Sequence, residues 1–466
     1  MHQTIKWILK NKVFIILGFI VLFAFILRVY QLGDSSMWID ETISSLASRE
    51  ILEKGFPMFD SGLFYKRALF FHYLMSVAIF FINNDFGARL ISVLFGTASV
   101  ILSFILAREF GNKNNVAGLT AALFTAVLFL EIAYSRQARF YQMFQFLFFL
   151  TLFFLYKSKE NKKYALLASI TLIFLVDTHL AGLILLPFFV YLFSKEHKDW
   201  KLFIIPFLIC LYYAPSFSTI STGNKEVITS YIENYSSNLF YHLRAFSIIS
   251  LLGLPFAWKW NKRLTLILIL PSITLLFSLF FVKVYALRYA YFIVLLAPIM
   301  ISVLFSFIYN SNKIFFTLVL VVAIIYPSNL FFDTGQLTIA IPENTQLYTS
   351  SEPIIEYKNL SPSIKEEIMN SKTLVLFTPG FAWYYKNPDY FLSFSLNGLS
   401  TGYQIYNNSD SYTGAKKFNF DTTNFIFIED YFGYSKLNPV EKEKVDKLKE
   451  NCSLIEEKSF LKIYKC

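Results

Sequence analysis

Long apolar runs separated by short polar segments make up the first 333 residues of the chain. Eleven of these runs are long enough, or nearly so, to cross the hydrocarbon core of a bilayer as helices. The first run ends at Arg28 and has no small-residue cleavage site, so it predicts a membrane span rather than a removed signal peptide. The eleven runs cover approximately residues 13–30, 90–107, 116–133, 141–156, 164–178, 180–193, 202–217, 244–258, 264–282, 289–308 and 314–332.

A further run, Ala68–Ile82, is shorter and contains His72. Counting it as a span would reverse the side of every later loop. Lysine and arginine collect in the cytoplasmic loops of membrane proteins. With eleven spans and a cytoplasmic N-terminus, short inner loops hold 16 of the 28 basic residues before Thr334, whereas twelve spans would put Lys157–Lys163 outside. We therefore expect Ala68–Ile82 to be an interfacial helix in the first outer loop, with a later outer turn at Asp177–His179.

The chain changes character after about Phe332, where Pro, Asn, Ser, Glu and Lys return and no later run could cross a bilayer. Short β-rich runs (373–377, 424–428 and 460–464) alternate with a charged helical stretch, Pro439–Glu450, which is typical of a small α/β domain. We predict a polytopic α-helical membrane domain over residues 1–333. A soluble extracytoplasmic α/β domain is expected over residues 334–466.

Composition agrees with a chain embedded in lipid. Hydrophobic residues make up 55% and charged residues 16% of the sequence, against about 25% charged residues in ordinary soluble domains. The net charge of +10 is uneven: 14 lysines oppose 16 carboxylates from Thr334 onward, and 28 basic residues oppose 16 acidic ones before it. The positive-inside rule accounts for this excess without a nucleic acid. Disordered, collagenous, disulfide-dense and soluble nucleic-acid-binding classes are excluded.

Polar and aromatic residues gather in the predicted outer loops. Carboxylates there can act as a general base, cations can hold a phosphate, and aromatic rings suit a sugar or a headgroup-level surface. The spans show no midplane chain of ionisable residues, which a proton-coupled pump would need. The outer-loop residues are Trp38, Asp40, Glu41, Tyr65, Lys66, Arg136, Arg139, Tyr141, His179, Arg288 and Tyr289.

Six of these residues also have a structural interpretation. A Trp near a span end is usually an aromatic-belt anchor, and acidic residues favour the first turn of a helix, here one expected over Thr42–Lys54. Arginines at span ends can be snorkelling anchors, and a lone turn histidine is more often only polar. These alternatives apply to Trp38, Asp40, Glu41, Arg136, Arg139 and His179.

The order of the segments resembles the GT-C membrane glycosyltransferases, in particular the prokaryotic branch related to protein O-mannosyltransferases and the lipid A aminoarabinose transferase. The likeness extends from Arg28 to about Phe193, with weaker support from Arg288-Tyr289 before a span with Pro298. Each motif is weak alone, but the set in this order is fairly specific. The motifs are Trp38–Glu41, Asp85–Leu90 leading into Phe95-Gly96, Tyr134–Tyr141 and Thr178–Leu180.

The resemblance implies a plasma-membrane glycosyltransferase of the cell envelope. It would move a hexose or pentose, with inversion, from a polyprenyl-phosphate donor to a hydroxyl of a glycan, lipid or protein on the outer face. The family's first-loop aspartate is the proposed base and corresponds to Asp40, with Glu41 as the neighbouring acid. No cofactor is expected, since the sequence shows neither a nucleotide-sugar phosphate loop nor Cys/His metal spacing. Carboxylates of relatives can nevertheless bind a divalent ion.

The phosphate ligands also follow from the resemblance. The family's first-loop lysine corresponds to Lys66, but the two prolines that usually follow it are Arg67 and Ala68 here. The family's Arg-Glu-Ala-Arg motif becomes Arg136-Gln137-Ala138-Arg139, which predicts a different acceptor if the missing acid contacts it. The predicted site therefore has Asp40 and Glu41 as catalytic residues, Lys66, Arg136, Arg139 and Arg288 at the donor phosphate, and Trp38, Tyr65, Tyr141, His179 and Tyr289 at the substrate.

Two other functional classes stay open. One is a transporter or lipid flippase with a large outer domain, which inverted repeats or paired broken helices would favour. The other is a non-catalytic membrane scaffold or sensor that displays the tail. Neither inverted repeats nor paired broken helices are visible in the sequence. Only the enzyme requires a carboxylate beside phosphate-binding cations, which makes Asp40-Glu41 the discriminating feature.

Cys452 and Cys466 flank a segment with the pattern of a β-hairpin, with strands over 453–456 and 459–465 and a turn near Glu457-Lys458. Opposed ends of antiparallel strands lie about 4.5–5.5 Å apart in Cα, within reach of a disulfide. An outer location permits oxidation, and Cys210 lies in a predicted span. We predict a Cys452–Cys466 disulfide, with two free thiols as the alternative.

Overall fold

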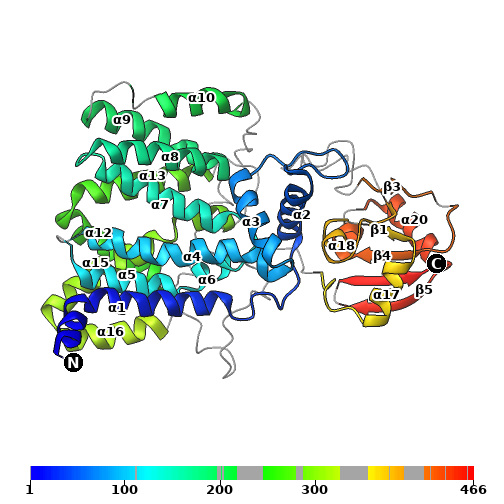
Figure 1. Cartoon of the computed structure of the whole chain (residues 1–466), viewed down its shortest axis with the longest axis horizontal. Helices are drawn as coiled ribbons and strands as arrows, with labels where there is room; N and C mark the ends of the chain where they lie inside the picture. The colour runs from blue at the N-terminus through cyan, green and yellow to red at the C-terminus, as the bar shows by residue number, and fades with distance from the viewer. Residues whose placement is uncertain are drawn as a thin grey trace. The chain divides into compact units, whose positions relative to one another are not determined.

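The computed structural model forms two compact units (Figure 1). Unit 1 comprises Met1–Tyr30 and Ser92–Pro342, and unit 2 comprises Gln31–Ile91 and Glu343–Cys466. The first outer loop thus groups with the C-terminal part of the chain, and the expected boundary at 333/334 lies outside the described residues. The structure describes residues 2–110, 113–196, 201, 204–217, 245–279, 287–325, 355–376, 378–392, 414–419, 421–435, 437–458 and 460–466.

Unit 1 is built from helices. Helix α5 packs against α1 and α15, α12 packs against α15, and α7 packs against α8. Within the part of the chain that the structure describes, three helices are long and apolar enough to cross a membrane, Asn11–Val29, Asp85–Arg108 and Arg288–Ser311, and the bent pair α5–α6 could be a fourth span. The number of eleven spans stays a prediction. The helices are α1 (His2–Val29), α4 (Asp85–Arg108, which begins in unit 2), α5 (Asn115–Val127), α6 (Phe129–Ser135), α7 (Tyr141–Lys157), α8 (Lys162–Thr178), η1 (Leu180–Leu185), α9 (Leu186–Glu196), α10 (Ile204–Phe217), α12 (Ala245–Trp260), α13 (Lys262–Ser278), α14 (Leu287–Ala290), η4 (Tyr291–Ile293), α15 (Leu296–Ser311) and α16 (Lys313–Ile325).

Helix α1 shows what a lipid-facing surface of unit 1 looks like. Its side chains Phe19, Leu22 and Ile26 are 69, 54 and 50% exposed, whereas Ala24 and Leu27 are buried against α4 and α5. A wide apolar face left exposed on a long helix is expected where the surrounding solvent is lipid rather than water. The structure thus supports a membrane location.

The apolar run 116–133, one of the eleven expected spans, forms two helices in the structure. Helices α5 and α6 meet at Leu128 with a bend of 60°. A break frees backbone carbonyls that must find donors within the membrane. The Arg28 guanidinium supplies them, donating to Thr125 O and Ala126 O at 3.1 Å each. A cation at the C-terminal end of α5 also complements the helix dipole.

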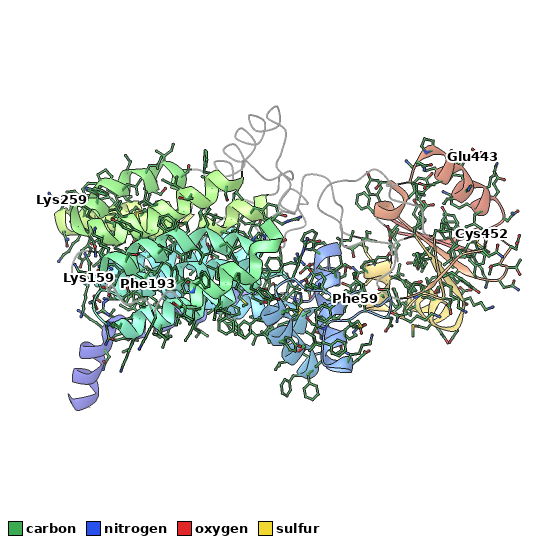
Figure 2. The ribbon with its side chains drawn as sticks, turned by 90° about the horizontal axis from the view of Figure 1, so that it is seen from above. Phe59, Lys159, Phe193, Lys259, Glu443 and Cys452 are labelled. Atoms are coloured by element: carbon green, nitrogen blue, oxygen red, sulfur yellow. A yellow bond between two sulfur atoms is a disulfide. The ribbon has the colours of Figure 1, made fainter. Side chains whose placement is uncertain are left out.

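Three predicted inner loops contact one another at one end of unit 1. Lys157 Nζ pairs with Glu109 Oε2 at 2.8 Å. Asn261 Nδ2 donates to Tyr156 Oη at 2.8 Å and to Glu109 O at 3.3 Å. Figure 2 shows Lys159 and Lys259 at this same end. The loops after α4, α7 and α12 thus lie together, as a shared side of the membrane requires.

Unit 2 contains a six-stranded sheet in the order β3-β2-β1-β4-β6-β5. The first four strands are parallel, and β6 is antiparallel to β4 and β5. The expected runs 373–377, 424–428 and 460–464 correspond to β1, β4 and β6, except that Phe377 lies outside the described residues. The helix Pro439–Glu450 is confirmed with these bounds. The strands are β1 (Thr373–Val375), β2 (Tyr390–Phe391), β3 (Lys416–Lys417), β4 (Ile426–Asp430), β5 (Ser453–Lys458) and β6 (Leu461–Lys465).

Both faces of this sheet are covered. Alternate residues of a strand point to opposite faces, so Val375 packs with Ile364 of α17, whereas Leu374 packs with Val445 of α20. Because both faces are buried, the sequence of β4 does not alternate between apolar and polar residues as a half-exposed strand would. The helices of unit 2 are α2 (Ile39–Lys54), α3 (Leu69–Phe81), α17 (Pro362–Asn370), α18 (Thr378–Tyr384), α19 (Tyr431–Ser435) and α20 (Pro439–Glu450).

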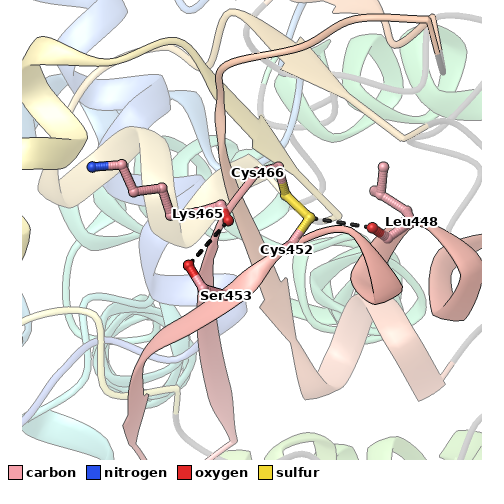
Figure 3. Close-up of a disulfide and its surroundings, with 5 residues drawn as sticks. All are labelled: Leu448, Cys452, Ser453, Lys465 and Cys466. Carbon is pink, nitrogen blue, oxygen red and sulfur yellow. Dashed lines mark hydrogen bonds between the residues drawn. A yellow bond between two sulfur atoms is a disulfide. The ribbon is translucent and has the colours of Figure 1, made fainter.

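The predicted Cys452–Cys466 disulfide is present, with the two Cα atoms 4.2 Å apart (Figure 3). Ser453 pairs with Lys465 across the hairpin, and Ser453 Oγ donates to Lys465 O at 3.4 Å. The turn was expected near Glu457-Lys458, but β5 continues through Lys458 and Phe460 takes the positive φ of 63° at the turn. A β-bulge between Leu454 and Glu456 adds one residue to β5 relative to β6.

The run Ala68–Ile82 forms helix α3. Its exposed side chains include Tyr73, Val77, Phe80 and Phe81, which recur at helical spacing along one face. Such a stripe suits a helix that lies on a membrane surface. The interfacial location of α3 stays a prediction.

Candidate functional site

The predicted carboxylates of the first outer loop lie in the first turn of α2. This helix begins at Ile39, three residues earlier than expected, with Trp38 as its N-cap. The Trp38 backbone N–H donates to Glu41 Oε2 at 3.3 Å, which satisfies one of the free amides at the helix start. Trp38, Asp40 and Glu41 are all buried. The expectation that Asp40 and Glu41 precede the helix is therefore corrected, and both carboxylates complement its dipole.

Glu41 is held in a buried ion pair with Arg89. Arg89 Nε lies 2.9 Å from Glu41 Oε1, and Nη2 lies 3.0 Å from Oε2, so the pair is bidentate. Asp40 is 7% exposed, on the adjacent position of the helix. Both oxygens of Glu41 are thus engaged by the guanidinium of Arg89.

Arg89 also fixes the chain that leads to these residues. Its Nη1 donates to Leu32 O at 2.8 Å and to Ser35 O at 3.1 Å, and its Nη2 donates to Ser36 O at 3.3 Å. One side chain therefore holds both the loop before α2 and its first turn. Arg89 belongs to the Asp85–Leu90 motif, for which the sequence alone indicated no role. The sequence feature that could have indicated a role is the position of Arg89, a charged residue directly before the strongly apolar run 90–107.

Tyr65 and Lys66 lie between α2 and α3. Tyr65 is buried, and its ring meets His72 edge to face at 5.1 Å, whereas Lys66 is exposed. Ala68, the N-cap of α3, has a φ of 48°. Proline cannot adopt this φ. The backbone after Lys66 thus differs from what the family's two prolines would allow.

In unit 1, Arg136 anchors the end of α1. Its Nη1 donates to Tyr30 O at 2.5 Å and to Arg28 O at 3.1 Å. Cations near the C-terminal end of a helix satisfy its last carbonyls and complement its dipole. This geometry favours the structural interpretation of Arg136. The same buried segment continues into Arg139.

The other predicted residues of unit 1 converge on one aromatic cluster. Arg139 lies over the rings of Phe140 and Tyr141, at 4.8 and 5.5 Å from their centroids. His179, between α8 and η1, lies 6.1 Å from the Phe140 ring and 5.9 Å from the Tyr289 ring.

The neighbouring cation extends this cluster. Arg288 lies 5.7 Å from the ring of Tyr289 and is 8% exposed. Residues of the Tyr134–Tyr141 segment, the His179 turn and the start of α14 thus lie close together. Residues 283–286 of the expected later loop lie outside the described residues.

A buried polar network behind this cluster was missed from the sequence. Glu131 of α6 accepts from Gln145 Nε2 at 2.9 Å and from the Tyr291 hydroxyl at 3.0 Å. Gln142 Nε2 donates to Ser99 Oγ at 3.1 Å and to Glu131 Oε2 at 3.4 Å. The sequence feature that could have indicated this network is Glu131 itself, a carboxylate within the predicted span 116–133. Burying a carboxylate in a membrane is energetically costly unless it has partners.

The predicted site residues therefore fall into one group in each unit. Among the residues that the structure describes, no cluster of three or more His, Cys, Asp or Glu side chains could hold a metal ion. The group in unit 2 is Trp38, Asp40, Glu41, Tyr65 and Lys66, and the group in unit 1 is Arg136, Arg139, Tyr141, His179, Arg288 and Tyr289.

The sequence matches no protein-family model and no curated protein. Solved structures are nevertheless similar in fold. ArnT from Cupriavidus metallidurans, the lipid A aminoarabinose transferase, covers 96% of this chain over 98% of its own, with 11% identity and a TM-score of 0.64 in the apo state. The same protein bound to undecaprenyl phosphate gives 12% identity and a TM-score of 0.57.

A second similar structure is the archaeal oligosaccharyltransferase AglB from Archaeoglobus fulgidus, in complex with an inhibitory peptide and a dolichol-phosphate. It matches 79% of this chain with 13% identity and a TM-score of 0.50, and this chain spans 62% of its length. ArnT and AglB are both members of the GT-C superfamily. The expected fold is thus confirmed by structural similarity.

Proposed function

We propose that this chain, which has the fold of the GT-C glycosyltransferases, is an integral-membrane glycosyltransferase that uses a polyprenyl-phosphate sugar. The observation that carries the proposal is the buried carboxylate pair at the start of α2. Arg89 binds both carboxylate oxygens of Glu41 through two of its nitrogens. We assign the role of proton acceptor to the adjacent Asp40. The structure of ArnT with undecaprenyl phosphate supports a lipid-linked donor.

In the proposed reaction an acceptor hydroxyl attacks the anomeric carbon of the sugar. Asp40 takes the hydroxyl proton, because a free hydroxyl is a poor nucleophile. The bond between the anomeric carbon and the phosphate oxygen breaks, and the polyprenyl phosphate leaves with the electron pair. A single displacement of this kind inverts the configuration at that carbon.

Cations stabilise the charge that develops on the leaving phosphate. By resemblance, Lys66, Arg139 and Arg288 take this role. Arg136 is the weakest member of the predicted set, since its Nη1 already binds the end of α1. We assign the sugar and acceptor to the aromatic residues and the turn histidine: Trp38, Tyr65, Tyr141, His179 and Tyr289.

We propose an outer-face reaction at the plasma membrane, with a cytoplasmic N-terminus and an extracytoplasmic C-terminal domain. The contacts among the loops after α4, α7 and α12 support this topology, because these loops carry the clustered basic residues. The positive-inside rule then puts that end of unit 1 in the cytoplasm.

A lipid transporter or flippase is the second candidate, favoured by the bent pair α5–α6. Broken helices commonly expose backbone groups to a transported substrate. Here the Arg28 guanidinium fills the break by binding Thr125 O and Ala126 O. The carbonyl groups at the break are thus bound by the protein itself and not offered to a substrate. This arrangement supports the enzyme over the transporter.

The test is incubation of the purified chain in proteoliposomes with a panel of radiolabelled polyprenyl-phosphate sugars. A glycosyltransferase cleaves the sugar–phosphate bond, so free sugar or glycosylated acceptor should accumulate, and the Asp40→Asn variant should lack this activity. Movement of intact donor between leaflets without bond cleavage would instead establish the transporter.

A further inference from the structure

Helix α18 of the C-terminal domain binds the segment that leads into α2. The Tyr384 hydroxyl accepts a hydrogen bond of 2.7 Å from the Met37 backbone N–H and donates one of 3.0 Å to Asp85 Oδ2. Met37 directly precedes the N-cap Trp38, so its amide lies outside the helical ladder and needs a partner from elsewhere. A single phenol thus joins this segment to the start of α4.

The neighbouring tryptophan makes the same connection. Trp383 Nε1 donates to Asp85 Oδ1 at 2.8 Å. Arg49 of α2 lies over the Trp383 ring at 4.3 Å and donates to the Trp383 carbonyl at 3.2 Å. Trp383 and Tyr384 of α18 therefore contact both the α2 region and the start of α4.

An ion pair adds to these contacts, which we call the α18 clamp: the hydrogen bonds of Trp383 and Tyr384 to Asp85 and Met37. Lys358 Nζ lies 3.3 Å from Asp85 Oδ2 and also donates to Gly33 O. Burial raises the pKa of the Tyr384 phenol, and the negative charge of Asp85 raises it further. The phenol therefore stays protonated and remains a donor to Asp85 throughout the physiological pH range.

We propose that the C-terminal domain positions the base of the reaction, with Tyr384 as its principal positioning residue. Through Met37 it fixes the entry to α2 and therefore the first helical turn, which carries Asp40 and the Glu41–Arg89 pair. The domain is thereby an integral part of the catalytic machinery and not an attached binding module. This inference rests on the proposed function for the role of Asp40.

Tyr384→Phe in the full-length protein tests the clamp, because it removes only the hydroxyl. Tyr385→Phe is the matched control: its hydroxyl donates to Tyr357 O within the C-terminal domain and does not bind the first loop. Hydrogen–deuterium exchange over residues 37–42 should speed up several-fold in Tyr384→Phe and stay unchanged in Tyr385→Phe. Unchanged exchange in Tyr384→Phe, or equal acceleration in both variants, would overturn the proposal.

Transfer kinetics provide the second readout. Tyr384→Phe should lower kcat about tenfold, because a misplaced base loses its alignment with the acceptor, and should leave the KM for the donor unchanged. A variant with normal kcat would show that Tyr384 is structural only. If the unmodified protein cleaves no donor, the proposed function fails, and the exchange data still decide whether α18 holds the segment.

Discussion

The Tyr291 hydroxyl donates a hydrogen bond to Glu131 Oε2 across 3.0 Å, although 160 residues separate the two in sequence. This contact ties η4 to α6, and Gln145 ties both to α7. Arg139 lies two residues before α7, and Arg288, in α14, lies three residues before η4. A buried network thus stands behind the two cations that we assign to the donor phosphate.

Glu131→Ala should destabilise unit 1 by about 3 kcal/mol, because the buried Gln145 and Tyr291 donors lose their hydrogen bonds to the carboxylate. Thermal unfolding in detergent measures the loss. Glu160→Ala is the control. The Glu160 side chain is exposed, so its ion pair with Lys157 should contribute less than about 1 kcal/mol to the free energy of unfolding. Equal effects of the two substitutions would contradict the role of the network.

Gly96→Ala should also destabilise the helical unit, by about 1–3 kcal/mol. A Cβ at this position would lie 2.4 Å from Ser135 Cβ and 3.0 Å from Arg28 Nε, so α4, α6 and the arginine would have to separate. Gly18 of α1 has nothing within 4 Å of an added Cβ, so Gly18→Ala should be neutral or stabilising. Melting temperatures that fall in both variants would argue against close packing at Gly96.

Asp40→Asn and Glu41→Gln should have different consequences. Asp40→Asn should lower transfer by about 10²–10⁴-fold, the usual contribution of a general base, while the melting temperature and donor binding stay near those of the unmodified protein. Glu41→Gln should lower stability by about 3–5 kcal/mol, because it leaves Arg89 buried without its counter-charge. Transfer rates and unfolding curves of both variants separate the roles, and full activity in Asp40→Asn would remove it as the base.

Lys66→Ala, Arg139→Ala and Arg288→Ala should each weaken binding of polyprenyl phosphate about tenfold, which corresponds to the loss of one charge-assisted hydrogen bond. Arg67→Ala is the matched control, because Arg67 is exposed beside Lys66 and has no assigned role. Binding of the polyprenyl phosphate alone, without sugar, is the measurement. Affinities that are unchanged in all three variants would reject the phosphate assignment.

The disulfide predicts a defined pattern of thiol reactivity. The chain has three cysteines, so only Cys210 should be alkylated in denatured, unreduced protein, and all three after reduction. Removing the bridge by Cys452→Ser and Cys466→Ser together should destabilise the C-terminal domain by roughly 3 kcal/mol, as expected for a short closed loop. Intact mass before and after reduction reports the thiols, and three alkylated cysteines without reductant would refute the bridge.

Sequence patterns predicted the features that depend on local chemistry. Hydropathy located the helices of unit 1, the charged helical stretch Pro439–Glu450 was predicted with its observed bounds, and the hairpin pattern between Cys452 and Cys466 located the strands that the disulfide joins. The same patterns could not predict the break at Leu128. Hydropathy is an average over the side chains of a run and contains no information about the backbone dihedral angles.

The missed features depend on partners distant in sequence. Helix α2 begins early because Glu41 is fixed by Arg89, and strands β2 and β3, with two residues each, are too short for a periodic signal. The grouping of the first outer loop with the C-terminal part rests on contacts such as Met37–Tyr384. No local pattern in the sequence carries this information.

The bond between Met37 and Tyr384 also sets an order of events during biosynthesis. The two residues are 347 positions apart, so at ordinary translation rates the ribosome makes Tyr384 roughly 20 to 70 s after Met37. During that interval the spans can insert one after another, while the Met37 amide has only water to bind. The first outer loop therefore matures last, when nearly the whole chain has been released. A nascent or prematurely terminated chain is expected to be inserted in the membrane but inactive toward the donor lipids around it.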